Sequence, residues 1–158
     1  MGNTKRLKER EITMVSDENL ILENQLSFIM YACAKETIKR YKTYLDEIGL
    51  TYTQYITMLV LWNGDNIPVN ELGKRLYLDS GTITPLLKKL EGKELVERIR
   101  DTNDERAVLV RVTLKGLELK NSVRNIPEKI LAETGVPAEE ANNVLEILKS
   151  ILVRVNNK

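Results

Sequence analysis

The sequence predicts a mainly α-helical chain with one small β-hairpin, and three patterns support this fold class. Apolar residues recur at helical spacing over most of the 158 residues. Two short runs, residues 95–100 and 107–113, instead alternate as strands do and contain valines. Polar segments with Gly, Asn or Pro separate the runs, as expected between short elements. The length fits one domain, or one domain with helices that pack against a second copy.

The stretch Leu76–Glu91 predicts a short turn followed by a helix. Asp79 or Ser80 can cap this helix, since a side-chain oxygen there can accept a free backbone N–H of the first turn. Pro85 falls within the first turns, where its missing N–H costs little. The predicted buried stripe consists of Leu86, Leu87 and Leu90. We expect five polar side chains to face outward: Ser80, Thr82, Thr84, Lys88 and Lys89.

The neighbours of this helix predict a winged helix-turn-helix. Val69, Leu72 and Leu76 indicate a preceding two-turn helix, and residues 77–79 form a connection short enough for a helix-turn-helix. The two predicted strands follow, joined by a polar loop at residues 101–106. In such an arrangement the second helix enters the major groove of DNA, and the hairpin tip reaches the adjacent backbone or minor groove.

Further helices are predicted on both sides. Upstream, the pattern is helical from residue 18 to 48, and Leu26–Ala34 is apolar on nearly every side, which predicts burial on more than one face. Gly49 ends this helix, and Thr51 caps another that runs through Trp62. This second helix has a predicted apolar core face formed by Tyr55, Met58, Leu59 and Trp62. Downstream, residues 113–133 and 138–155 predict two helices. The last has an apolar stripe that two chains could bury together: Val144, Leu145, Leu148, Ile151, Leu152 and Val155.

The overall charge of the chain does not by itself indicate a protein that binds nucleic acid. Formal net charge is +1, and residues 69–111 hold nine Lys and Arg against eight Asp and Glu. An interface with phosphates would therefore depend on where the charges are placed. We expect the following cations to face phosphates: Lys88, Lys89, Arg98, Arg100, Arg106 and Arg111.

Several other classes of protein are disfavoured. One cysteine and no histidine exclude a Cys/His metal cluster, an internal disulfide and a His-based triad. There is no glycine-rich phosphate loop, so we expect neither an enzyme nor a bound metal or cofactor. No stretch approaches the length of a membrane span, and residues 1–12 lack an apolar signal core. We therefore expect a cytoplasmic protein.

The residues around the predicted recognition helix resemble the MarR family of bacterial repressors. The resemblance rests on Leu78-Asp79-Ser80-Gly81-Thr82, Thr84-Pro85-Leu86-Leu87-Lys88 and Asp104-Glu105-Arg106. It extends from about Leu22 to the C-terminal helix and is strongest to the organic hydroperoxide branch, the OhrR and SarZ-type regulators. It implies a homodimer, joined by the N- and C-terminal helices, that reads an inverted-repeat operator in double-stranded DNA. It also implies that Arg106 is the wing-tip cation in the minor groove and that Asp104 holds it.

The same resemblance points to a sensor pocket whose reacting atom is changed. In the hydroperoxide branch a reactive cysteine occupies position X of a segment like Leu22-Glu23-Asn24-Gln25-Leu26-X-Phe28, and here X is Ser27. The tyrosines that match the family pocket are all present: Tyr31, Tyr41 and Tyr52. Peroxide oxidises a thiolate, and a serine hydroxyl does not undergo this step.

Three explanations for Ser27 stay open. The serine is an engineered replacement that traps the reduced, DNA-binding state. Alternatively, it is a natural residue, and the protein has lost peroxide sensing or senses at another position. In the third explanation, Cys33 has taken over the role of the peroxide-reactive cysteine. On a helix, Cys33 would point about 120° away from Ser27, which makes this third explanation geometrically awkward. The alternative to a redox role is that Cys33 is a buried, small apolar residue of the core.

The sequence thus divides into a flexible arm (1–17), an N-terminal dimerisation and sensor helix (18–50), a winged helix-turn-helix (51–113) and C-terminal dimerisation helices (114–158). We expect a homodimeric DNA-binding regulator, a repressor of the peroxide-responsive type. Three alternatives remain: a repressor released by a small aromatic or phenolic ligand, a thiol-dependent redox protein using Cys33, and a winged-helix protein used only for protein interaction.

Overall fold

The computed structural model describes residues 17–64, 66–102 and 107–156, and the chain divides into two compact parts between Glu36 and Thr37. The first part begins with two 3-10 turns, Asp17–Leu20 and Leu22–Asn24. Helix α1 (Leu26–Glu47) follows, and its second half belongs to the second part. The predicted arm lies outside the described residues except for Asp17.

The helix predicted from residue 18 therefore begins eight residues later. Side chains in this region bond to nearby backbone carbonyls, as the Asn24 amide does to the Glu18 carbonyl oxygen at 3.0 Å. Such local hydrogen bonds offer the backbone an alternative to a regular helix. Gln25 keeps an extended backbone conformation, so the α-helix can begin only after it.

The apolar segment Leu26–Ala34 is open to solvent within the single chain. None of its residues is buried, and Leu26 is 62% exposed. Leu45 is the one buried residue of α1. The predicted burial on more than one face was expected where two subunits interlock, so for the single chain it stays a prediction. An exposed apolar surface of this kind is typical of protein interfaces.

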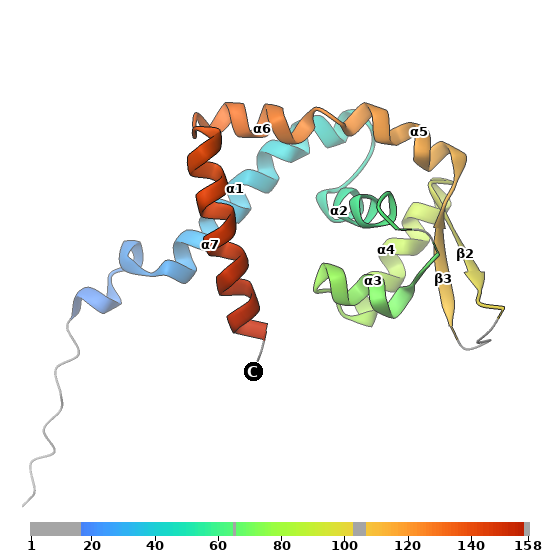
Figure 1. Ribbon diagram of the computed structural model, residues 1–158, viewed down its shortest axis with the longest axis horizontal. Helices are drawn as coiled ribbons and strands as arrows, with labels where there is room; N and C mark the ends of the chain where they lie inside the picture. The colour runs from blue at the N-terminus through green and yellow to red at the C-terminus, as the bar shows by residue number, and fades with distance from the viewer. Residues whose placement is uncertain (1–16, 65, 103–106, 157–158) are drawn as a thin grey trace, which may run out of the picture. The chain divides into compact units, whose positions relative to one another are not determined.

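The second part contains a winged helix-turn-helix (Figure 1). A short strand comes between the first two helices, and its pairing gives a three-stranded antiparallel sheet in the order β1-β3-β2. The sequence did not predict β1, which has only two residues. The elements are α2 (Tyr52–Leu61), β1 (Ile67–Pro68), α3 (Val69–Leu76), α4 (Ser80–Gly92), β2 (Val96–Arg100) and β3 (Val108–Val112).

Local signals set most of these boundaries. Gly49, in the left-handed region with φ 68°, lets the chain turn after α1. Thr51 caps α2 in a capping box with Gln54. Tyr77, with φ 55°, ends α3 in the left-handed conformation that closes many helices.

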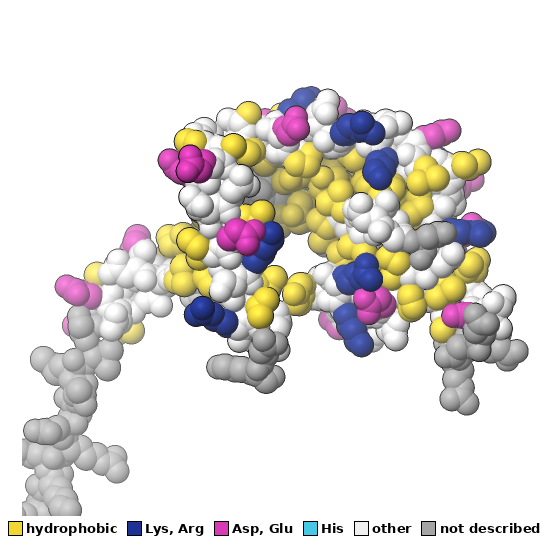
Figure 2. Space-filling model, viewed as in Figure 1, with side chains coloured by type: hydrophobic (Ala, Val, Ile, Leu, Met, Phe, Trp, Pro, Cys, Tyr) yellow, Lys and Arg dark blue, Asp and Glu magenta, His cyan; other side chains and the backbone are white. Residues whose placement is uncertain are grey.

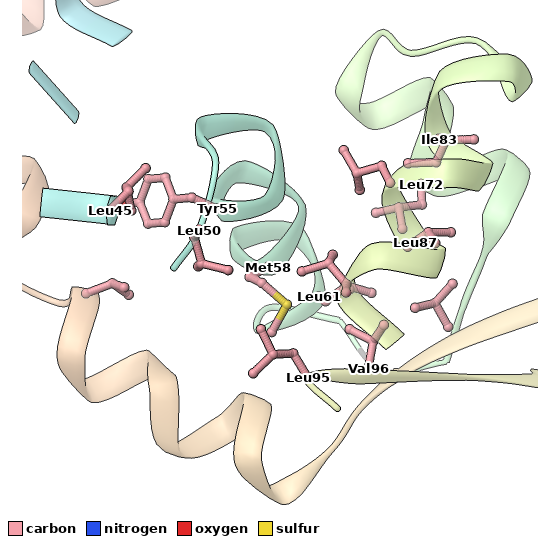
Figure 3. Close-up of a cluster of buried hydrophobic side chains, with 14 of the residues drawn as sticks. Leu45, Leu50, Tyr55, Met58, Leu61, Leu72, Ile83, Leu87, Leu95 and Val96 are labelled. Carbon is pink, nitrogen blue, oxygen red and sulfur yellow. The ribbon is translucent and has the colours of Figure 1, made fainter. Parts of the chain in front are cut away.

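The core of the second part lies between α2, α3, α4 and the sheet, and it continues to α1 and to the helices after the sheet through Leu45, Val123, Ile126 and Ile130. Figure 3 shows Met58 of α2 on the side of Leu95 and Val96, with Leu72 and Leu87 from α3 and α4 further along, while Tyr55 lies on the other side of α2 beside Leu45 of α1. The predicted apolar face of α2 is confirmed for Tyr55 and Met58, while Leu59 is exposed and Trp62 is half-buried. The Trp62 indole Nε1–H donates to the Gly116 carbonyl oxygen at 2.8 Å, which ties α2 to the segment after the sheet.

The C-terminal region holds three helices instead of the predicted two: α5 (Leu114–Val123), α6 (Ile126–Thr134) and α7 (Ala138–Asn156). The break falls before Pro127, which sits in the first turn of α6. A proline within a continuous helix would lose a backbone hydrogen bond and clash with the preceding turn. None of the residues of α7 is buried, and its predicted apolar stripe is largely exposed (Figure 2).

Within the described ranges, no helix is both long enough and apolar enough to cross a membrane.

Candidate nucleic-acid interface

Helix α4 begins as the sequence predicts. Asp79 is the N-cap, and its Oδ1 accepts the Thr82 backbone N–H at 2.8 Å. The buried stripe of Leu86, Leu87 and Leu90 is confirmed and also includes Ile83. Pro85 is the sixth residue of the helix and so lies within its first two turns, as predicted. Because proline has no N–H, the carbonyl of Gly81 receives no hydrogen bond from residue 85.

The outer face of α4 carries donors and no free acid. The five predicted polar residues, Ser80, Thr82, Thr84, Lys88 and Lys89, are all exposed. Glu91 is the one acidic residue between Ser80 and Gly92, and it is engaged by Arg98 of β2. The face therefore offers hydroxyl and ammonium groups to an anionic partner although the whole chain is nearly neutral.

Two of the cations expected to face phosphates form ion pairs with acids in the single chain. Arg98 Nη2 lies 2.6 Å from Glu91 Oε2, and Arg111 Nε lies 2.7 Å from Glu97 Oε1. Glu97 and Arg111 stand directly opposite each other on β2 and β3, which explains their pairing. Periodicity alone cannot reveal such a partner, because it depends on strand register.

The wing-tip residues Asp104 and Arg106 lie outside the described residues. The two strands that lead to them are in register from Val96–Val112 to Arg100–Val108. The Asp101 N–H donates to the Ala107 carbonyl oxygen at 3.0 Å and continues the ladder beyond the last paired strand residues.

The predicted sensor residues fall in both parts of the chain. In the first part, Ser27 and Tyr31 are exposed and one helical turn apart on α1. The ammonium of Lys35 lies 6.0 Å from the centroid of the Tyr31 ring. Cys33 is a free and exposed thiol. The alternative of a buried Cys33 is therefore wrong for the single chain.

In the second part, the rings of Tyr41 and Tyr52 lie close together, with centroids 5.1 Å apart. Their role in a sensor pocket stays a prediction. Tyr55 completes the cluster at 5.6 Å from Tyr41 and 6.3 Å from Tyr52. Burial raises the pKa of all three phenols, that of Tyr55 to about 12. Tyr55 was predicted only as part of the apolar core face of α2. Its position three residues after Tyr52 was the available signal.

No group of three or more His, Cys, Asp and Glu side chains that could hold a metal ion occurs in the part of the chain that the structure describes.

Comparisons with known proteins agree with this arrangement. The family model named Transcriptional regulator SarA/Rot matches residues 39–123. The regulator SarZ of Staphylococcus epidermidis is 40% identical over 137 residues, which are 87% of this chain and 93% of that protein. The organic hydroperoxide resistance transcriptional regulator of Bacillus subtilis is 39% identical over 141 residues, which are 89% of this chain and 96% of that protein.

The chain belongs to the MarR family of transcriptional regulators. A solved structure supports the same membership. Reduced AbfR bound to DNA superposes with a TM-score of 0.72 at 31% identity, covering 88% of this chain and 96% of that chain. AbfR comes from Staphylococcus epidermidis. The predicted fold class and the predicted family are thus confirmed. The likeness of this MarR-family chain to SarZ and to the hydroperoxide regulator also agrees with the predicted organic hydroperoxide branch.

Proposed function

We propose that this MarR-family protein is a homodimeric, sequence-specific DNA-binding repressor. The observation that carries the proposal is the acid-free outer face of α4, with its hydroxyl groups at the front and two lysines behind them. A helix of this composition beside a β-hairpin suits entry into the major groove. The relatives are named as transcriptional regulators, and AbfR has been solved on DNA.

The proposed DNA contacts divide between the helix and the wing. Ser80, Thr82, Thr84 and Lys88 meet bases and phosphates in the major groove, and Lys89 lies at the edge of this surface. Arg106 enters the minor groove from the wing tip, and Asp104 orients it by a charge-assisted hydrogen bond.

A homodimer supplies the second half of the interface. Exposed apolar side chains on α1 and α7 support this part of the proposal, since soluble chains rarely leave so many uncovered. Two recognition helices about 34 to 36 Å apart would read the two halves of an inverted repeat. The proposed location is the cytoplasm, where bacterial DNA is found.

Titration of DNA with the protein at several salt concentrations tests the proposal. A fluorescent duplex from the upstream region of the gene, beside a scrambled duplex, gives affinity by anisotropy. We expect log affinity to fall linearly with log salt, and Lys88→Gln to lower the slope by about 0.9 for each phosphate that the side chain no longer neutralises. Lys129→Gln on α6 is the matched control. Absent or salt-independent binding would favour a protein that acts only through protein interactions.

The proposed regulator lacks the peroxide-reactive thiol of its branch, because Ser27 occupies that position. A second candidate function is release from DNA by a small aromatic or phenolic ligand. A cavity of about 130 Å³ between α2 and the start of α6, lined by Tyr55, Leu59, Trp62 and Pro127 among others, favours it. Apolar cavities of about 150 Å³ are known to take up benzene. Phenol and benzoate are the probes, and calorimetric binding with loss of DNA affinity would support this alternative.

A thiol-dependent redox role of Cys33 is the remaining alternative, and the exposed position of the thiol is the observation in its favour. Catalytic consumption of cumene hydroperoxide that disappears in Cys33→Ala would support it. Stoichiometric or absent consumption would speak against it.

A further inference from the structure

We infer that Glu133, near the end of α6, is a positioning residue that sets the distance between the two recognition helices of a dimer and so selects the spacing of the operator half-sites. This inference rests on the proposed homodimeric, DNA-binding function and adds a residue outside the proposed DNA-contacting surface. Glu133 is the penultimate residue of α6 and lies five residues before α7 begins at Ala138. Both of its carboxylate oxygens are bonded to α1.

Two side chains of α1 meet the Glu133 carboxylate. The Tyr44 hydroxyl donates to Oε1, and Arg40 Nη1 donates to Oε2 at 3.4 Å. Arg40 and Tyr44 lie one helical turn apart on α1. Lys129, one turn before Glu133 on α6, places its ammonium group 5.4 Å from the centroid of the Tyr44 ring. These four side chains, two from each helix, form one network, which we call the α1–α6 clamp.

The clamp differs from an isolated surface ion pair. Such a pair contributes little, because water screens it and two long side chains must be ordered to form it. Tyr44 is half-buried and its ring packs against the hydrophobic core, so the ring is ordered independently of Glu133. The Tyr44 hydrogen bond is the main reason why the pKa of Glu133 is lowered and the pKa of Tyr44 is raised. The clamp therefore ties the end of α6 to a side chain that the core already holds.

The end of α6 controls the direction of α7. Helix α7 leaves α6 at a sharp corner over residues 135–137 (Figure 1). This corner is held by hydrogen bonds of its own, from the Gly135 N–H to the Ala132 carbonyl oxygen at 3.1 Å and from the Val136 N–H to Thr134 Oγ1 at 3.2 Å. None of the described residues of α7 is buried, so its direction depends mainly on this corner and on α6.

A small change at the base of α7 has a large effect at its far end. The helix has 19 residues and is therefore about 28 Å long. A rotation of about 10° at its base would move its far end by about 5 Å. This displacement exceeds the rise of one base pair in DNA, about 3.4 Å. The geometry at the end of α6 therefore matters on the scale at which half-site spacing is read.

The clamp connects the proposed dimer surface to the DNA-binding elements of the same chain. Helix α7 carries the apolar stripe proposed to join two copies. Helix α1 reaches the core of the winged helix-turn-helix through Leu45, which is fully buried. Two recognition helices of a dimer must lie about 34 to 36 Å apart to read adjacent turns of the duplex. By fixing α7 relative to the winged core, Glu133 fixes this distance.

Glu133→Ala tests the inference, because it removes both hydrogen bonds from an exposed helical position without leaving a cavity. A hydroxyl-radical footprint first locates the bound inverted repeat in the upstream duplex, and one base pair is then inserted or removed at its centre. We expect this change to lower wild-type affinity about tenfold and the affinity of Glu133→Ala about threefold or less. Affinity for a duplex with a single half-site should be unchanged, since the DNA-contacting surface is kept.

Asp46→Ala is the matched control. Asp46 is an exposed acid of α1 that accepts from Lys42 of the same helix, so the substitution removes an equal charge without touching α6. We expect this control to keep the spacing preference of the wild type. The same preference in wild type and Glu133→Ala would overturn the inference while leaving the proposed function intact. A preference relaxed equally in Asp46→Ala would also overturn it, because the loss of charge alone would then be the cause.

Tyr44→Phe removes the hydroxyl group and keeps the ring that packs on the core. If Tyr44 and Glu133 act through one hydrogen bond, the double variant should show the same relaxed spacing preference as Glu133→Ala alone. Additive effects of the two substitutions would overturn the clamp as their common cause. If Glu133→Ala fails to fold, Tyr44→Phe takes its place in the spacing measurement.

The distance between recognition helices can also be measured without DNA. Spin labels at Lys89→Cys of both copies, in a Cys33→Ser background, report this distance by pulsed electron resonance. We expect a narrow distribution of distances with Glu133 and a broader one with Glu133→Ala, whereas an unchanged distribution would overturn the inference. A wild-type protein that gives no distance between copies, or that binds no DNA, would overturn the proposed function and this inference together.

Discussion

Glu91 at the end of α4 holds Arg98 of β2 through three hydrogen bonds. Its Oε2 accepts from Nε at 3.0 Å and from Nη2 at 2.6 Å, and its Oε1 accepts the Arg98 backbone N–H at 3.2 Å. The recognition helix is thereby fixed to the first strand of the wing. The guanidinium hydrogen bonds are the main reason why the pKa of Glu91 lies below its usual value.

Glu91→Gln should lower the free energy of unfolding at pH 7 by up to about 1 kcal/mol, since the pair is partly exposed to solvent. A lowered carboxyl pKa stabilises the fold above the ordinary value near 4.3 and loses this effect as pH falls through the folded value. The difference between variant and wild type should therefore shrink below about pH 4. Urea unfolding at several pH values measures it, with exposed Glu118→Gln as control. A difference that is constant down to about pH 2.5 would contradict the assignment.

Gly116→Ala should destabilise the fold by about 2 to 3 kcal/mol or more. A Cβ atom there would lie 2.2 Å from the Leu95 carbonyl oxygen and 2.7 Å from Val112 Cγ1, and the carbonyl belongs to the backbone. Gly92→Ala is the control, because nothing lies within 4 Å of its added Cβ. The control should be neutral or gain up to about 1 kcal/mol from helix propensity. Similar urea midpoints for both variants would argue against this packing.

Tyr55→Phe should protect the fold at alkaline pH. Burial raises the pKa of Tyr55 to about 12, from an ordinary value near 10. A raised phenol pKa means that the unfolded chain releases its proton first, so stability is lost as pH rises from about 10 toward 12. Removing the hydroxyl removes this loss. Unfolding at pH 7 and pH 11, with tyrosinate absorbance as a second signal, checks it. An unchanged pH dependence would count against the buried phenol.

Leu148→Lys should convert the proposed dimer into monomers. Leu148 belongs to the apolar stripe of α7 and is 39% exposed in the single chain. A lysine there would have to lose its hydration in a chain-to-chain interface, which is costly for an unpaired charge. Sedimentation velocity at micromolar concentration measures the state, and Asn143→Lys on the same helix is the control. A monomeric wild type would refute the dimer proposal directly.

Ser27→Cys should make DNA binding sensitive to organic hydroperoxide if the pocket of the hydroperoxide branch is otherwise kept. A thiolate at this position can form a sulfenic acid, whereas the serine hydroxyl cannot. Wild-type protein should stay bound to the upstream duplex when cumene hydroperoxide is added, and the variant should dissociate. If both proteins stay bound, the pocket serves another signal, and release by an aromatic ligand becomes the leading hypothesis.

Sequence patterns were sufficient where contacts within about four residues decide the structure. The Asp79 cap, the α3–turn–α4 unit and the leucine stripe of α4 follow from local spacing, and all were predicted. The family also followed from short motifs in this segment. The start of α1 was missed because the segment before Leu26 forms local side-chain hydrogen bonds, and the break before Pro127 was missed although the proline itself marked it.

The tertiary structure decided the features that join residues far apart in the chain. Strand β1 exists only through its pairing with β3. Arg98 is paired because α4 places Glu91 beside it, and Arg111 is paired because the register of β2 and β3 places Glu97 opposite it. The sequence by itself therefore determined which residues carry exposed hydroxyl and ammonium donors on α4. Only the fold decided which of those donors are free, because ion pairing and burial depend on neighbours that no local pattern specifies.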